Sequence, residues 1–274
     1  MSNDPVRIVV LFPDLLGTYG DGGNGLVLHR RLQWRGIASE LIDIHSGEPV
    51  PEDGHLYLLG GGEDAPQIEA ARALGTDGPV HRAIGRGAVV LAVCAGMQIA
   101  GTSFPDSEGG ARDGLGLLDC VTVKTTEPRA VGELLVDVDP AFHLPPLTGF
   151  ENHGGRTRLG PTARTLGRVR AGVGNGDGSE GVVSGPSGSE AAGGGGPGTV
   201  VGTYLHGPVL ARNPALADLL LAWALDQPVT DLAPLLEPDA EAEALRAERL
   251  LAVERGNLDG VARRTWRDRL TGRS

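Results

Sequence analysis

Cysteine is scarce in this chain, which has two cysteines among 274 residues. Two cysteines cannot build a disulfide framework or a four-ligand zinc site. Basic residues are outnumbered too, because 24 Lys and Arg stand against 35 Asp and Glu, a formal net charge of −11. This acidic balance argues against a nucleic-acid surface as the main function.

Long apolar runs and targeting signals are also missing. No run of about 18 apolar residues is present, so no transmembrane helix is expected. The first residues, MSNDPVRIVVLF, lack a basic region and a small-residue cleavage site, so no signal peptide is expected. We therefore expect a soluble, cytoplasmic protein of one or two domains.

Apolar runs and helical patterns alternate in the first half of the chain. Such alternation predicts an α/β fold with an open, mostly parallel sheet flanked by helices. The expected strands are 6–12, 40–44, 55–59 and 88–93. One expected helix ends near Gly36, and two more span 66–74 and 80–85.

The second half is less regular. Further strands are expected at 120–124, 133–138, 168–173 and 199–205, and the Gly-rich stretch 184–198 is expected to be a flexible surface insertion. Asn213 is the expected N-cap of a helix that runs to about 225. These features suggest a domain at 1–235. The remaining segment, 236–274, would consist of a C-terminal helix at 239–254 and a basic tail. The tail is expected to be either a solvated terminus or a contact arm for a partner protein.

Cys94 is the strongest chemical signal. It follows an apolar strand, Ala95 and Gly96 make a tight turn, and a helix begins at once. A nucleophile at such an elbow projects from the carboxyl edge of the sheet, where the helix N-terminus favours a thiolate and the Ala95 amide faces an oxyanion. Cys120 lies inside a strand pattern and is expected to be structural.

A thiol nucleophile needs a base, and two of the seven histidines are candidates. His206 follows a strand and therefore lies at the edge where open α/β sheets place ligands. His153 lies in a polar, glycine-flanked segment, 149–156, which is expected to be a loop, and it is the rival.

Two glycine runs could suggest nucleotide binding. The run 17–25 lacks the Gly-Lys-Ser/Thr ending of a phosphate-binding loop. The run Gly60-Gly61-Gly62 follows a strand at the same edge as Cys94. Because glycine lets the backbone approach a ligand, this run favours an oxyanion loop. A simple tight turn remains the alternative.

Three motifs together resemble class I glutamine amidotransferases of the cobyric-acid-synthase branch. They are LLGGGED (58–64), VCAGMQ (93–98) and GTYLHGP (202–208), joined by GFENHGGRT (149–157). Because GFENHGGRT occurs together with GTYLHGP, the chain looks most similar to the glutaminase subunits of lipid II isoglutaminyl synthase. The similarity covers most of 6–225 and implies a flavodoxin-like fold with a helical tail.

The resemblance implies a role for each matching residue. Cys94 matches the nucleophile, His206 the base, and Gln98 and Arg129 match positions that contact substrate, whereas Gly61 and Ala95 belong to the oxyanion site. The subunit would release ammonia from L-glutamine for a MurT-like partner of the Mur-ligase family in a heterodimer. That partner would amidate lipid II in peptidoglycan synthesis. The resemblance implies no cofactor or metal here and places ATP and Mg in the partner.

One departure concerns the residue that orients His206. Many class I domains have His-x-Glu, but here Pro208 stands where Glu would be. Glu151 and Asp64 are conceivable replacements, and an acidic residue of the partner is the favoured one. On that hypothesis the isolated chain is a weak glutaminase, and its partner raises kcat about 10-fold or more.

Other functions remain open. A cobyrinate-type amidotransferase would use the same glutaminase, although it would be expected to carry a fused synthetase domain. The fold could also serve a non-catalytic regulatory domain, or a cysteine peptidase or chaperone. Ammonia release from glutamine discriminates among these classes.

Overall fold

A computed structural model describes residues 4–17, 20–185 and 195–255. Its centre is a six-stranded sheet with the order β13-β14-β4-β3-β1-β2, parallel except for β13. The apolar side chains of β1, β3, β4 and β14 are almost all buried, as is typical of parallel strands with both faces covered. The strands are β1 (Val6–Leu11), β2 (Ser39–Ile44), β3 (Leu56–Leu59), β4 (Val89–Val93), β13 (Val182–Ser184) and β14 (Val200–Thr203).

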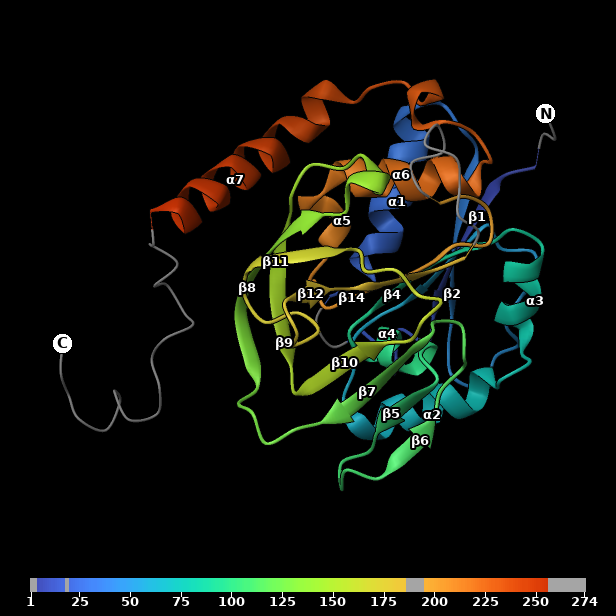
Figure 1. Ribbon diagram of the computed structural model, residues 1–274. Helices are drawn as coiled ribbons and strands as arrows, with labels where there is room; N and C mark the ends of the chain where they lie inside the picture. Colours follow the sequence, from blue (N-terminus) through green and yellow to red (C-terminus); the bar gives the residue numbers. More distant parts are fainter. Residues whose placement is uncertain (1–3, 18–19, 186–194, 256–274) are drawn as a thin grey trace.

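Helices cover this sheet (Figure 1). Helix α1 packs on β1 and β2 and against α6, whereas α4 packs on β3, β4 and β14 and against α2. The α/β fold with a mostly parallel sheet is therefore confirmed. The helices are α1 (Gly23–Trp34), α2 (Asp64–Leu74), α3 (Pro79–Gly85), α4 (Ala95–Ala100), α5 (Val209–Arg212), α6 (Pro214–Ala224) and α7 (Leu236–Glu254), with short turns η1 (Pro140–Phe142) and η3 (Val229–Asp231).

Two smaller sheets lie between β4 and β14 in the sequence. One has the order β10-β7-β5-β6 and the other β12-β11-β8-β9. Their strands are β5 (Ser103–Pro105), β6 (Ala111–Asp113), β7 (Cys120–Lys124), β8 (Ala130–Val138), β9 (Leu147–His153), β10 (Gly155–Leu159), β11 (Gly167–Ala171) and β12 (Ser179–Glu180).

Three sequence-based expectations need correction. The segment 149–156 is not a loop, because it forms the end of β9 and the start of β10. Asn213 does occupy the N-cap position of α6, but its side chain makes no capping bond: Oδ1 accepts the Thr148 amide and Nδ2 donates to the Thr148 carbonyl in β9. In the stretch 184–198, residues 186–194 lie outside the described residues, and Gly195 is buried against Trp223 rather than on the surface.

Helix α7 confirms the expected C-terminal helix and starts three residues earlier than predicted. None of its residues is fully buried, and it extends along one side of the molecule in Figure 1. The basic tail lies outside the described residues. No helix in the described ranges is both long and apolar enough to cross a membrane.

Candidate active site

Cys94 lies at a strained elbow between β4 and α4. Its φ is 51° and its ψ −104°, a conformation that a non-glycine residue adopts only when its surroundings enforce it. The Cys94 amide donates to the Thr203 carbonyl at 2.8 Å, and the Cys94 carbonyl accepts from the Gln98 amide at 3.0 Å. These bonds fix the backbone of the elbow at the carboxyl end of β4, directly before α4.

Glycine is required beside the elbow for steric reasons. A Cβ on Gly96 would come within 2.6 Å of the Leu59 carbonyl oxygen. The Gly96 amide donates to the Gly60 carbonyl at 3.1 Å, so the elbow and the glycine loop after β3 are in direct contact.

His206 follows β14, the strand next to β4, and is almost fully buried. Its amide donates to the Phe150 carbonyl of β9 at 2.6 Å, which anchors the segment. Its imidazole contacts the Cys94 side chain and a carboxylate, Asp21. The structure therefore brings the expected nucleophile and base together.

Asp21 is a site residue that the sequence reasoning missed. It is 3% exposed and lies just before α1; its Oδ2 is 3.6 Å from His206 Nδ1 and accepts the Gly61 amide at 2.8 Å. Asp21 lies within the glycine run 17–25, whose pattern suggests nucleotide binding rather than a catalytic carboxylate. An acidic residue shortly after β1, and so close to the carboxyl edge of the sheet, was the available signal.

The electrostatics of His206 follow from this arrangement. Burial lowers the pKa of His206, but its contacts with Asp21 and Cys94, and the negative charges of both, outweigh burial and raise the pKa to about 10. An imidazole that holds its proton can act as a general acid beside the Cys94 side chain.

Gln98 is held in a buried polar network. Its Oε1 accepts from Gln67 Nε2 at 2.9 Å, and its Nε2 donates to Tyr204 Oη at 3.3 Å. Tyr204 Oη is also 2.8 Å from Thr157 Oγ1. The amide of Gln98 is thus fixed in orientation beside the elbow.

His153 has a different environment from His206. Both ring nitrogens are engaged, Nδ1 with the Gly155 carbonyl at 3.1 Å and Nε2 with Glu151 Oε2 at 3.2 Å. Its ring stacks on Tyr204 with centroids 3.6 Å apart. The stacking supports the Tyr204 ring. Glu151 bonds His153 and therefore does not orient His206. Asp64 is exposed at the start of α2.

Arg129 precedes β8 and is exposed. Its Nε donates to Asn152 Oδ1 at 2.6 Å. A Cβ on Gly154 would lie 3.9 Å from Arg129 Nη1, and one on Gly155 would lie 2.9 Å from Gln98 Nε2. Arg129 and Gln98 therefore both lie near the Gly154–Gly155 pair.

Cys120 lies in β7 and is buried. Burial, and after it the charge of Asp119, raises the pKa of the Cys120 thiol to about 12. A thiol that stays protonated is a poor nucleophile, so the structure agrees with a structural role. Across the described ranges no cluster of three or more His, Cys, Asp or Glu side chains could hold a metal ion.

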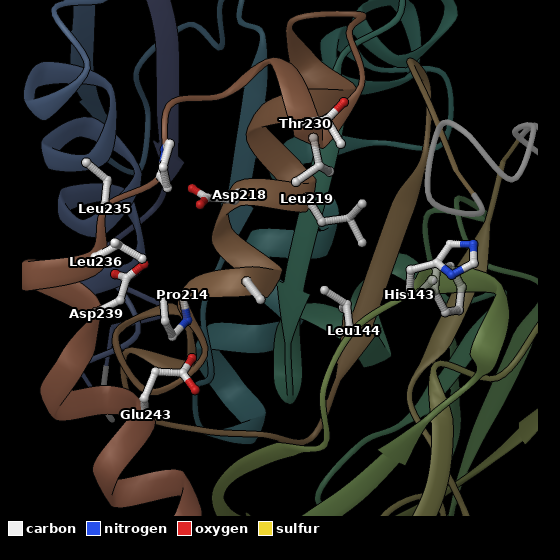
Figure 2. A pocket seen from close by; sticks show the side chains of 14 residues that line it. His143, Leu144, Pro214, Asp218, Leu219, Thr230, Leu235, Leu236, Asp239 and Glu243 are labelled. Atoms are coloured by element: carbon white, nitrogen blue, oxygen red, sulfur yellow. The ribbon is translucent and has the colours of Figure 1, made fainter.

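A cavity of about 620 Å³ lies elsewhere, between η1, α6 and α7. Its walls are mostly apolar, and Asp218 and Asp239 lie at one side (Figure 2). None of the residues around Cys94 lines it, so it is separate from the candidate active site.

The comparisons with known proteins agree with this geometry. Residues 7–214 match the CobB/CobQ-like glutamine amidotransferase domain, and the chain belongs to this family. It is therefore a glutamine amidotransferase in which Cys94 and His206 occupy the candidate active site.

Two individual relatives are similar over most of their length. The GatD subunit of the glutamine-hydrolysing lipid II isoglutaminyl synthase of Staphylococcus aureus is 33% identical over 89% of this chain and 93% of that protein. The corresponding subunit of Streptococcus pneumoniae is 33% identical over 80% of both chains. Cobyric acid synthase of Sphingopyxis alaskensis is 33% identical over 67% of this chain but 34% of its own length.

Proposed function

We propose that this chain is the glutaminase subunit of a lipid II isoglutaminyl synthase. The observation that carries the proposal is the strained Cys94 elbow facing His206, in a chain that aligns with 93% of a GatD subunit. Cobyric acid synthases align with it over about a third of their length, as expected for a shared glutaminase part.

The proposed chemistry proceeds through a thioester. The Cys94 thiolate attacks the carboxamide carbon of L-glutamine, and backbone amides at the Gly61 loop and Ala95 stabilise the oxyanion. His206 gives its proton to the departing ammonia. It then takes a proton from water, which attacks the thioester and releases glutamate and regenerates the thiol.

Substrate contacts are assigned to the two residues around the glycine pair. Gln98 offers an amide whose orientation is fixed, and Arg129 offers a guanidinium with Nη1 beside Gly154. A guanidinium is the natural partner of the α-carboxylate of glutamine.

The ammonia would be used by a partner. We propose a MurT-like subunit of the Mur-ligase family that activates the D-glutamate carboxyl of lipid II with ATP and Mg and amidates it to D-isoglutamine. Because this step consumes ATP, we place the heterodimer in the cytoplasm.

The test replaces the nucleophile. Cys94→Ala in the complex is expected to abolish ammonia release from glutamine and glutamine-dependent amidation of lipid II, while amidation with added ammonium salt persists. Cys120→Ser is the matched control and should keep nearly full activity, since Cys120 is buried in β7. Activity retained by Cys94→Ala and lost by Cys120→Ser would contradict the assignment.

A further inference from the structure

Asp21 lies next to both the Gly61 amide and the His206 imidazole. Its Oδ2 accepts the Gly61 amide at 2.8 Å and lies 3.6 Å from His206 Nδ1, beyond an ordinary hydrogen bond. Its Oδ1 is buried without a hydrogen-bond partner among the residues that the structure describes. A buried carboxylate with an unused oxygen has strong reason to bind a further donor.

The packing around Asp21 explains how it reaches His206. A Cβ on Gly23 would meet Pro208 Cβ at 3.1 Å, so the start of α1 packs directly against Pro208. The Asn24 side chain accepts the Leu210 amide at 3.0 Å and joins α1 to α5. The start of α1 therefore covers Pro208, the position at which many class I domains have glutamate. Asp21 directly precedes α1 and so lies close to His206.

Gly61 completes the contact. A Cβ at this position would lie 2.8 Å from His206 Cε1 and 3.0 Å from Asp21 Oδ2. The oxyanion loop, the base and Asp21 therefore lie directly beside one another.

Resting on the proposed function, we propose that Asp21 positions His206 and that its carboxylate exchanges between the Gly61 amide and His206 Nδ1 during the reaction. In the resting state the carboxylate accepts the Gly61 amide, so that this N–H of the oxyanion loop is not available to a substrate oxyanion. On His206 it accepts Nδ1–H, keeps Nε2 directed at Cys94, and leaves the Gly61 N–H for the oxyanion.

The movement required is small. An approach of about 0.8 Å, the difference between 3.6 and 2.8 Å, would bring Oδ2 to hydrogen-bond distance from Nδ1. One carboxylate would thus couple orientation of the base to opening of the oxyanion site.

The test is Asp21→Asn in the full chain with its ligase partner. The amide oxygen can still accept from Gly61, but the charge beside His206 is gone. The expected result is a fall in kcat of about 100-fold or more with KM changed less than about threefold, since a general base contributes about 10²- to 10⁴-fold. Asp21→Glu should recover part of the loss.

A pH profile separates positioning from a merely structural effect. Asp21 and Cys94 are the titratable groups that contact His206, and the contacts with both raise the pKa of His206. Asp21→Asn should therefore move the alkaline limb of kcat/KM to lower pH. Asp14→Asn, which alters an exposed Asp14–His45 pair, is the matched control and should change neither kcat nor the profile.

The outcomes distinguish the two proposals. If Asp21→Asn keeps more than a third of the wild-type kcat in the complex, the orienting residue comes from the partner and the inference is wrong. If the wild-type complex releases no ammonia, the proposed function fails. Alkylation of Cys94 by iodoacetamide at neutral pH still tests Asp21, because Asp21→Asn should slow it about 10-fold; an unchanged rate in a variant with wild-type melting temperature overturns the inference.

Discussion

At the scale of single residues, the two candidate histidines differ in what their ring nitrogens contact. His206 faces a thiol and a carboxylate, an arrangement that accepts and returns a proton. His153 is fixed by Glu151 and the Gly155 carbonyl and supports the Tyr204 ring. The first environment suits a base, and the second suits a support beneath the substrate-binding network.

This difference predicts unequal effects of alanine. His206→Ala should lower kcat by about 10²- to 10⁴-fold. His153→Ala should cost about 1 kcal/mol of folding free energy through the lost stacking, and should mainly raise KM because Tyr204 holds Gln98. Steady-state ammonia release and chemical denaturation measure both. A full loss of kcat at His153 with a mild effect at His206 would reverse the assignment.

At the scale of elements, β12 holds the end of β14. Glu180 is fully buried and accepts the Thr203 hydroxyl and the Tyr204 amide, the latter at 2.9 Å. Thr203 Oγ1 in turn accepts the Leu205 amide at 3.0 Å. One buried carboxylate therefore organises the three residues that precede His206.

Glu180 should make stability depend on pH. Burial raises the pKa of Glu180 to about 7, against bonds that lower it. The folded pKa of Glu180 is higher than its unfolded pKa. The stabilisation that Glu180 contributes to the fold is therefore complete below the unfolded pKa and is lost as pH rises through the folded pKa. From pH 5 to pH 8 the wild type should lose roughly 2–3 kcal/mol of unfolding free energy relative to Glu180→Gln. Equal pH dependence in urea denaturation would contradict this.

At the scale of the whole molecule, one buried arginine joins three helices. Arg31 of α1 binds Asp218 of α6 at 2.7 Å and also Asp239 of α7, and Arg35 binds Asp218 as well. Asp218 and Asp239 also line the cavity between α6 and α7 (Figure 2). This cluster attaches the first turns of α7 to the body.

Loss of Arg31 should therefore loosen α7. Arg31→Met leaves Asp239 without its cation and should cost about 3 kcal/mol of unfolding free energy, because removing one partner of a buried ion pair exposes the desolvation cost of the other. Faster hydrogen exchange in 236–254 should accompany it. Arg30→Met, an exposed neighbour on the same helix, should change neither quantity; equal behaviour of the two variants would show that the cluster contributes little.

Some features of the fold were predictable because they depend on neighbours in sequence. The apolar runs that form β1, β3 and β4 and the small residues after Cys94 carry their conformational preferences locally. Strand β9 was missed because its end, Glu151-Asn152-His153, is polar in sequence, which is typical of a loop rather than of a buried strand. Glu151 and His153 are buried there only because they satisfy each other and the amides of Val173 and Gly174.

The sequence by itself determined the α/β class, the mostly parallel sheet and the sharp turn at Cys94 after an apolar strand, since periodicity and turn chemistry act over a few residues. The tertiary structure decided which carboxylate faces which histidine. Asp21 lies beside His206 because the start of α1 packs on Pro208. Glu151 does not pair with His206, because it bonds His153. Such pairings depend on the packing of segments distant in the chain, which no local pattern encodes.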